Sequence, residues 1–185
     1  DPQANSTKTL AKMGAVSYLQ ASSLFSDKTE ISLDHNSDQI TYIPADALMA
    51  DMERSNPEVL IAFKRNLIAL GNAFDFCIID TPPTLGLRMS AALISAQFVL
   101  SPIELEEYSI DGITKMLQTI FGVKEKWNKE LQFLGMLPNR FNPRSLAQKD
   151  TLSQLLQNYS HMIIPAKIGI RSSIPEALSE GIPVW

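Results

Sequence analysis

The chain has 185 residues, close to the usual size of one domain, and it is 45% hydrophobic and 19% charged. This ordinary globular composition excludes disordered, collagen-like and coiled-coil chains. A formal net charge of -4 excludes a protein that is basic throughout, but it does not exclude a local basic face. The single cysteine, Cys77, excludes an intramolecular disulfide and favours a reducing compartment, and no apolar run approaches the roughly 18 residues of a membrane span.

The sequence of the first third of the chain predicts a surface loop, a strand and a helix. Residues 17–40 are polar and irregular, as in an exposed loop. Residues 40–43 form a short β-branched and aromatic run before Pro44, which predicts a strand. Asn56 and Pro57 then resemble a helix start, and apolar residues recur at helical spacing until Gly71.

The next segment predicts a buried strand followed by a stiff turn. Residues 74–79 are almost continuously apolar, which suits a parallel strand that is covered on both faces. Asp80 ends this run, and Thr81-Pro82-Pro83 follows it. Thr84 is a possible N-cap for a further helix whose apolar stripe includes Leu87, Ala91 and Ile94.

The second half of the chain continues the alternation of strands and helices. Apolar runs predict strands at residues 98–103, 131–137 and 162–164, and helical spacing predicts helices around residues 113–121, 152–159 and 175–180. This pattern predicts an α/β fold, a doubly wound and mostly parallel sheet. Ligands of such sheets bind beyond the carboxyl ends of the strands. Candidate site residues therefore lie in segments 80–82, 102–107, 138–140 and 165–171.

Asp80 has two interpretations from its position alone. A carboxylate after a buried strand can hold Mg²⁺ beside a bound phosphate, directly or through water. The same residue type also caps helices. The two prolines that follow fix the backbone and stiffen the loop that carries the carboxylate, which favours the metal site.

Four segments together resemble the ParA family of deviant Walker-A partition ATPases. They are Asp-Pro-Gln-Ala-Asn at residues 1–5, Phe-Asp-Phe-Cys-Ile-Ile-Asp-Thr-Pro-Pro-Thr-Leu-Gly at residues 74–86, and residues 102–112 and 165–184. The second segment is similar to the family's Walker-B stretch, and the ordered set of four covers essentially the whole chain. Ala4 departs from the glycine that is usual in the first segment.

The resemblance implies a P-loop NTPase-like fold in which the first strand and the phosphate loop are absent from this chain. None of the eight glycines is followed by Lys, so the phosphate-loop pattern G-x-x-x-x-G-K-[ST] does not occur. We therefore expect residues 1–185 to be a single incomplete ParA-type ATPase domain, truncated at both ends and inactive alone. A degenerate paralogue is the alternative.

The resemblance also implies roles for individual residues toward ATP and Mg²⁺. Asp1 matches the family's Asp that positions or activates the attacking water, so it is the catalytic candidate. Asp80 matches the Walker-B Asp that fixes Mg²⁺. Asn139 matches an Asn that reads the adenine edge in the related MinD branch, with Arg140 beside it, and Pro165 matches the loop that packs against the base. A simple turn residue is the alternative for Asn139.

Glu106 matches a Glu near the nucleotide-dependent dimer interface of the family. The following position is usually aromatic, whereas here it is Glu107, and Tyr108 is displaced by one residue. The alternative for these acidic residues is a solvated helix start, which the helix dipole favours.

One stretch of the acidic chain is basic enough to bind DNA. Residues 115–149 carry seven Lys and Arg against two Glu, a local charge of +5. Non-specific DNA affinity needs such charge on one face. Arg144 lies close to where the family places a DNA-contacting Arg, and Lys115 and Lys149 are the other DNA-binding candidates. A solvated lysine face is the alternative for residues 124–129.

These observations predict an ATP-dependent DNA-segregation ATPase for plasmid or chromosome partitioning. By resemblance it would switch between a monomer and an ATP-sandwich homodimer on non-specific DNA, with a ParB-like centromere-binding protein as partner. We expect it in the cytoplasm, associated with the nucleoid and not with a membrane. The alternatives are a MinD-like membrane-associated positioning ATPase and a non-catalytic interaction protein that lost its P-loop.

Overall fold

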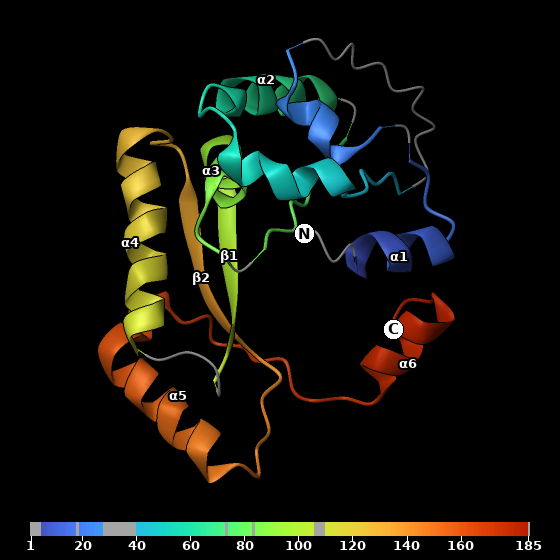
Figure 1. Cartoon of the computed structure of the whole chain (residues 1–185). Coiled ribbons are helices and arrows are strands. Elements are labelled where there is room, and N and C mark those ends of the chain that lie inside the picture. The colour runs from blue at the N-terminus through green and yellow to red at the C-terminus, as the bar shows by residue number, and fades with distance from the viewer. Residues whose placement is uncertain are drawn as a thin grey trace. The chain divides into compact units, whose positions relative to one another are not determined.

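The computed structural model consists of two compact units, each considered by itself (Figure 1). Unit 1 comprises the described residues of Asp1–Ser95 and Ser173–Trp185, and unit 2 spans Ala96–Ser172. The structure describes residues 5–17, 19–27, 40–72, 74–82, 84–105 and 110–184.

Within the described residues, the regular elements of unit 1 are helices. They are α1 (Asn5–Lys12), the 3₁₀ helices η1 (Ala21–Phe25) and η2 (Ala47–Arg54), α2 (Val59–Gly71), α3 (Leu87–Ser95) and α6 (Ser173–Glu180). The predicted helices before Gly71 and around Leu87 are therefore confirmed as α2 and α3. Helix α2 begins two residues after Pro57, and in the turn before it Asn56 Oδ1 accepts a hydrogen bond from the Glu58 N–H.

The core of unit 1 forms where η1, η2, α2 and α3 meet. Its buried apolar side chains are Leu24, Phe25, Met49, Phe63, Leu70 and Ala91. The rings of Phe25 and Phe63 lie 4.6 Å apart in a tilted arrangement. Aromatic pairs of this kind stabilise a core beyond the burial of their area alone.

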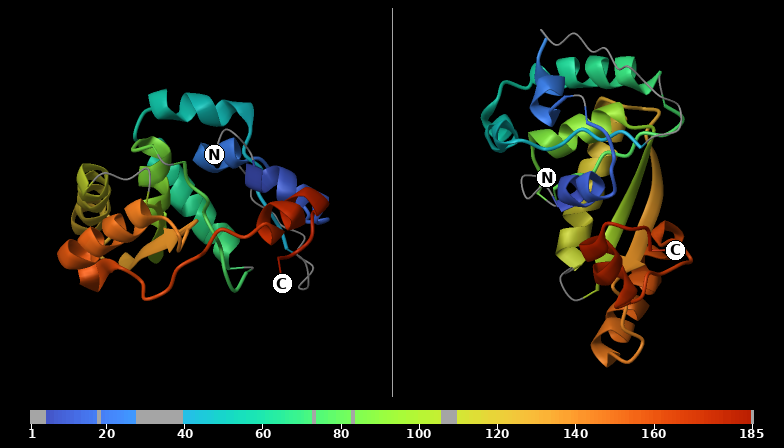
Figure 2. Two further views of the ribbon diagram at one scale, coloured as in Figure 1. Left: turned by 90° about the horizontal axis from the view of Figure 1, so that it is seen from below. Right: turned by 90° about the vertical axis from the view of Figure 1, so that its right-hand side faces the viewer.

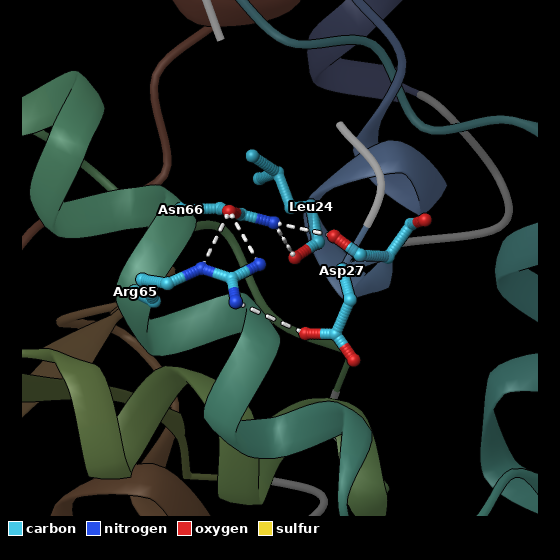
Figure 3. Close-up of polar contacts among 5 residues, drawn as sticks. Leu24, Asp27, Arg65 and Asn66 are labelled. Carbon is cyan, nitrogen blue, oxygen red and sulfur yellow. Dashed lines mark hydrogen bonds and ion pairs between the residues drawn. The ribbon is translucent and has the colours of Figure 1, made fainter. Parts of the chain in front are cut away.

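A buried polar residue joins α2 to the end of η1. Asn66 is only 4% exposed, and its Nδ2 donates to the carbonyl oxygens of Leu24 and Ser26, both at 2.9 Å. Figure 3 shows Arg65 beside it, donating to Asn66 Oδ1 and to Asp27 Oδ1. Because its amide group is satisfied on both sides, Asn66 can remain in the core without an unpaired polar group.

Helices α1 and α6 lie side by side although they stand at opposite ends of the sequence (Figure 2). The Lys12 ammonium donates to the Ser179 carbonyl at 3.4 Å. Gly181 follows α6 with φ +70, and a Cβ there would stand 2.7 Å from the Lys12 Cβ. A glycine is required at this point by both the backbone angle and the close approach.

Unit 2 is a parallel two-stranded sheet with helices packed against it. Strand β1 (Phe98–Glu104) pairs with β2 (Gln132–Asn139), and α4 (Ile110–Lys126) connects them; Figure 1 shows α4 beside the strands. Helix α5 (Leu146–Tyr159) and the short η3 (Ser160–Met162) follow. The α/β class with a parallel sheet is confirmed, although the described residues contain fewer strands than the sequence predicts.

The core of unit 2 lies between the sheet and the helices. Its buried members are Ile103, Leu105, Ile113, Leu117, Met136, Phe141 and Leu155. Ile113 and Leu117 come from the apolar stripe of α4, so the predicted helical spacing there is confirmed. The 14 residues of α5 exceed the predicted helix because Ser145 caps its first turn by accepting from the Gln148 N–H.

The pairing of β1 with β2 contains one irregularity. Val99 pairs with Phe133, but Leu100 pairs with Gly135, so Leu134 is an extra residue in β2. Gly135 has φ +128, and a Cβ at this position would stand 2.8 Å from the Met162 carbonyl oxygen. The bulge therefore depends on a residue without a side chain.

Three predicted strands do not form among the described residues. In each case no neighbouring strand pairs with the segment along its length. Residues 40–43 contribute one bridge, Thr41 to Val16, and residues 162–164 contribute one, Ile163 to Met136. No described strand pairs with residues 74–79, where Phe76 and Ile78 are 90% and 93% exposed. Apolar composition favours burial, but a strand forms only where an adjacent backbone completes its hydrogen bonds.

Gly135→Ala should destabilise unit 2, because an L-residue at φ +128 is strained and its Cβ would collide with a backbone carbonyl. We expect a loss of about 2 kcal/mol or more in the free energy of unfolding, measured with urea. Gly122→Ala is the matched control, since Gly122 lies within α4 and no atom stands within 4 Å of the point where a Cβ would lie. That change should stabilise the protein by roughly 0.5 kcal/mol. Equal effects of the two substitutions would contradict the assigned bulge.

Candidate functional site

Asp80 is an exposed carboxylate that lies against the first turn of α1. It follows residues 74–79 and precedes Thr81 and the buried Pro82. The Ser6 hydroxyl donates to Asp80 Oδ2 at 2.5 Å, and Ser6 is the second residue of α1. The first turn of a helix carries unpaired N–H groups and the positive end of the dipole, which favour a nearby negative charge.

The donors at Asp80 fit a Mg²⁺ ion that takes its remaining ligands from elsewhere. Mg²⁺ in nucleotide sites is typically held by one or two carboxylates, with waters and phosphate oxygens completing its shell. Within the described part of the chain, no group of three or more His, Cys, Asp and Glu side chains could hold a metal ion. A Mg²⁺ ion bound here would therefore depend on Asp80, water and a phosphate-bearing ligand.

The alternative of Asp80 as the cap of the next helix is wrong, because another carboxylate has that position. Glu53 of η2 accepts from the Leu87 N–H at 2.6 Å and from the Arg88 N–H at 3.4 Å. Arg88 Nε also donates to Glu53 Oε1 at 2.6 Å. Glu53, and not Thr84 as predicted, therefore caps α3.

The surroundings of Glu53 favour its ionised form. Partial burial would by itself raise the pKa of Glu53, but the hydrogen bond from the Arg88 side chain and the bonds from the Leu87 and Arg88 N–H groups outweigh burial. The result is a pKa below the ordinary value of 4.5. A lowered pKa means that the folded protein binds the proton less readily than the unfolded chain.

In unit 2, the parallel pairing brings two candidate segments to one edge of the sheet. Glu104 and Asn139 are register partners at the carboxyl ends of β1 and β2. Arg140 follows Asn139, and its Nε lies 3.6 Å from Glu104 Oε1. Both side chains of this ion pair remain substantially exposed, so it orients Arg140 more than it stabilises the fold.

The backbone at Arg140 is unusual. Arg140 has φ 52, in the left-handed region that non-glycine residues rarely adopt. Asn139 Oδ1 accepts from the Arg140 N–H at 3.0 Å, as expected of the turn interpretation. This bond uses neither Nδ2 hydrogen of Asn139 and leaves one lone pair on Oδ1, so the amide can still offer a donor and an acceptor to a base.

The loop that contains Pro165 lies beside the end of β2. The Ile164 N–H donates to the Met136 carbonyl, and the Ile168 N–H donates to the Pro138 carbonyl, both at 2.9 Å. Pro165 itself is exposed between these two anchors. The structure therefore places the predicted base-packing loop next to the strand end that carries Asn139, within the same unit.

A cation–π contact reinforces this loop. The Lys167 ammonium stands 4.5 Å from the centre of the Phe141 ring, and Phe141 also pairs with Gly169. Lys167 lies in the candidate segment 165–171, but neither Lys167 nor Phe141 was predicted individually as a site residue. Their sequence signal is position, since residues 165–171 follow one predicted strand end and Phe141 directly follows the segment 138–140 at another.

The three predicted DNA-binding residues are all exposed, but they do not form one tight cluster. Arg144 precedes α5 in a turn where Asn142 Oδ1 accepts the Arg144 N–H at 3.0 Å, and Lys149 lies on the first turns of α5. Lys115 lies on α4 beside Thr114, whose hydroxyl is 3.0 Å from the Tyr159 hydroxyl. Lys149 and Tyr159 are ten residues apart on α5, or about 15 Å along its axis. Any DNA-binding face that includes all three therefore extends along α5.

Two predicted residues lie outside the described residues. They are the catalytic candidate Asp1 and the dimer-interface candidate Glu106.

The hydrogen-bond partners of Asp80 and of the first turn of α3 are distant along the chain. Ser6 directly follows the Asp-Pro-Gln-Ala-Asn segment, but it stands 74 positions before Asp80. Glu53 stands 34 positions before the helix that it caps. No local pattern reports contacts over such distances along the chain.

Stability should fall at low pH through the protonation of Glu53. Because the folded pKa lies below 4.5, the contribution of Glu53 is fully present above that value and is lost as the pH falls through the lowered pKa. Urea unfolding at pH 7 and at successive values below 4.5 should show a steeper loss for the unchanged protein than for Glu53→Gln. Glu58→Gln is the control, because Glu58 is exposed and makes no ion pair among the described residues. Parallel pH profiles for all three proteins would contradict this role.

A family model described as an AAA domain (AAA_31) matches residues 1–133. Protein IncC of Escherichia coli is 42% identical over 195 residues, covering 100% of this chain and 53% of the relative. The chromosome-partitioning ATPase Soj of Treponema pallidum is 26% identical over 121 residues, covering 65% of this chain and 48% of the relative. The chain thus spans about half the length of these curated relatives.

Solved structures share the fold. Apo McdA from Cyanothece superposes with a TM-score of 0.77 at 24% identity, covering 100% of this chain and 77% of that chain. Cobyrinic acid a,c-diamide synthase from Mycobacterium smegmatis, with bound ADP and magnesium, has a TM-score of 0.60 at 27% identity over 84% of this chain and 75% of that chain. These likenesses confirm the P-loop NTPase-like fold class.

Among the described residues, no helix combines the length and the apolar character that crossing a membrane requires. The family match covers the Asp-Pro-Gln-Ala-Asn segment, the Walker-B-like stretch and residues 102–112, which are three of the four segments behind the resemblance. The chain belongs to the AAA_31 family of AAA domains, and its resemblance to the ParA partition ATPases is confirmed.

Proposed function

We propose that the protein to which this chain belongs is a ParA-type partition ATPase that uses ATP and Mg²⁺ to segregate DNA. The observation that carries the proposal is the exposed Asp80 carboxylate, which follows the Walker-B-like run inside the matched family segment and lies at the first turn of α1. The ATPase named among the relatives and the ADP and magnesium bound to a structural neighbour support the same chemistry.

Within this proposal, Asp80 holds Mg²⁺ and its water shell, and Asp1 positions the attacking water. Phosphoryl transfer depends mainly on such positioning and on charge stabilisation. Mg²⁺, when bound, neutralises charge on the phosphate oxygens. The role of this chain is to fix the carboxylate that retains the ion and to supply an acceptor for the proton of the water.

In unit 2, the amide of Asn139 reads the adenine edge, and the Pro165 loop packs against the base. The hydrogen-bonding groups left on Asn139 support this role. Arg140, oriented by Glu104 at 3.6 Å, presents a guanidinium to the nucleotide. The contacts of residues 164–168 with the end of β2 support the participation of Pro165.

The state that binds DNA is an ATP-bound homodimer with Glu106 near its interface, and hydrolysis returns the protein to a monomer. Lys115, Arg144 and Lys149 contact phosphates without reading bases, and a ParB-like centromere-binding protein stimulates release. The protein acts in the cytoplasm, on the nucleoid. The exposed cations of unit 2, in a chain of net charge -4, support this arrangement.

DNA retention should depend on ATP. The full-length protein should bind non-specific duplex DNA tightly with ATP and Mg²⁺ and weakly with ADP, because only the ATP-bound dimer presents two basic faces together. Co-sedimentation with DNA at about 100 mM salt measures this difference. Asp80→Ala should remove it by weakening Mg²⁺ retention, while the protein still folds because Asp80 is exposed. Equal DNA binding with both nucleotides, or none with either, would refute the partition role.

The three basic residues should each contribute one phosphate contact. Non-specific affinity falls linearly with the logarithm of salt concentration, and each lost contact reduces that slope by about 1. Alanine at Lys115, Arg144 or Lys149 should therefore lower both affinity and slope for any DNA sequence. Arg54→Ala is the control, because Arg54 is an exposed cation on η2 of unit 1. If Arg54→Ala changes the salt slope as much as the three substitutions in unit 2 do, the DNA-binding surface is not the one proposed.

A further inference from the structure

We propose that Ser6 is a positioning residue for Asp80, and that its hydroxyl orients the carboxylate for Mg²⁺ binding. The proposal rests on the role of Asp80 in the proposed function and goes beyond it, because it adds a residue outside the segments that define the family resemblance. Its starting point is the bond of 2.5 Å from Ser6 Oγ to Asp80 Oδ2.

An exposed carboxylate at the end of an irregular segment needs a partner to keep one orientation. Residues 74–80 form no strand, and Asp80 is exposed, so packing does not restrict its side-chain rotation. The carboxylate is planar, so a hydrogen bond to Oδ2 also fixes the position of Oδ1. A metal-binding carboxylate that is oriented in advance loses less conformational freedom when the ion binds.

The chemistry of the hydroxyl suits a partner of a metal-binding carboxylate. Ser Oγ donates its one proton to Asp80 and keeps two lone pairs, which can accept from a water bound to Mg²⁺. Hydrogen-bonded partners of metal-ligating carboxylates orient them and tune the site. Ser6 provides such a partner from the first turn of a helix rather than from a loop.

The competing explanation is that the bond only helps to hold α1 in place. The neighbouring hydroxyl in the same helix separates the two explanations. Thr7 Oγ1 accepts from the Ala45 N–H at 3.3 Å, so its hydrogen bond goes to a different segment from that of Ser6. If attachment of α1 is what matters, loss of either hydroxyl should have the same effect. If orientation of Asp80 matters, only loss of the Ser6 hydroxyl should affect the metal.

The experiment uses the full-length protein and two probes, Mg²⁺ and a fluorescent ATP analogue. Analogue affinity is measured first in EDTA and then during a Mg²⁺ titration, and the Tm of each variant is recorded. Ser6→Ala should raise the Mg²⁺ concentration for half-maximal effect by about tenfold. Affinity in EDTA should not change, because the hydroxyl acts through the carboxylate and the metal.

A pair of isosteric substitutions isolates the hydroxyl. Ser6→Thr keeps it and should titrate with Mg²⁺ like the unchanged protein, whereas Ser6→Val lacks it and should behave like Ser6→Ala. Thr and Val share size and branching, so this pair remains decisive even if Ser6→Ala lowers the Tm. Thr7→Val should leave the Mg²⁺ titration unchanged.

The outcomes separate this proposal from the function on which it rests. If Asp80→Ala shifts the Mg²⁺ titration but Ser6→Ala and Ser6→Val do not, Ser6 is not a positioning residue and the role of Asp80 stands. If Asp80→Ala causes no shift, the proposed Mg²⁺ role of Asp80 fails. Equal shifts for Ser6→Val and Thr7→Val, each with a lowered Tm, would assign the bond to attachment of α1 and overturn the proposal.

Discussion

The parallel pairing of β1 with β2 determines where the candidate residues of unit 2 lie. Parallel strands have their carboxyl ends at the same edge, so Glu104 and Asn139 become neighbours, and Arg140 follows within reach of Glu104. Parallel pairing also requires a long connection, which α4 supplies, and α4 contributes much of the apolar side that covers the sheet. The core and the polar strand ends of this unit are thus consequences of one pairing.

Much of this arrangement could be predicted from local patterns in the sequence. The apolar spacing correctly predicts α2 and α4, because one face of each helix is buried in a core. Apolar residues at helical spacing are typical of a helix with one buried face. The position of Asn139 at the carboxyl end of β2 was likewise predictable, because it ends an apolar run. Asp80 also follows an apolar run, but that run forms no strand in the structure.

The remainder depends on partners that are distant along the chain. Residues 74–79 have the composition of a buried strand, yet Phe76 and Ile78 are exposed because no described strand lies beside them. Glu53 replaces the local N-cap candidate Thr84, since its carboxylate reaches two N–H groups and the Arg88 side chain together. The composition of a segment indicates which secondary structure it prefers. Tertiary contacts decide whether that structure forms and which residues the segment contacts.

The backbone at Arg140 links the strand end to the function proposed for it. A residue other than glycine at φ 52 costs about 1 kcal/mol or more, and glycine would remove that cost. Here the side chain of Asn139 accepts the Arg140 N–H and stabilises the strained turn, while the exposed pair with Glu104 orients the guanidinium. Since a glycine would serve the turn better, the arginine is explained by its guanidinium and not by the backbone. This exposed guanidinium, paired with Glu104 at 3.6 Å, is the group that the nucleotide contact proposed for Arg140 requires.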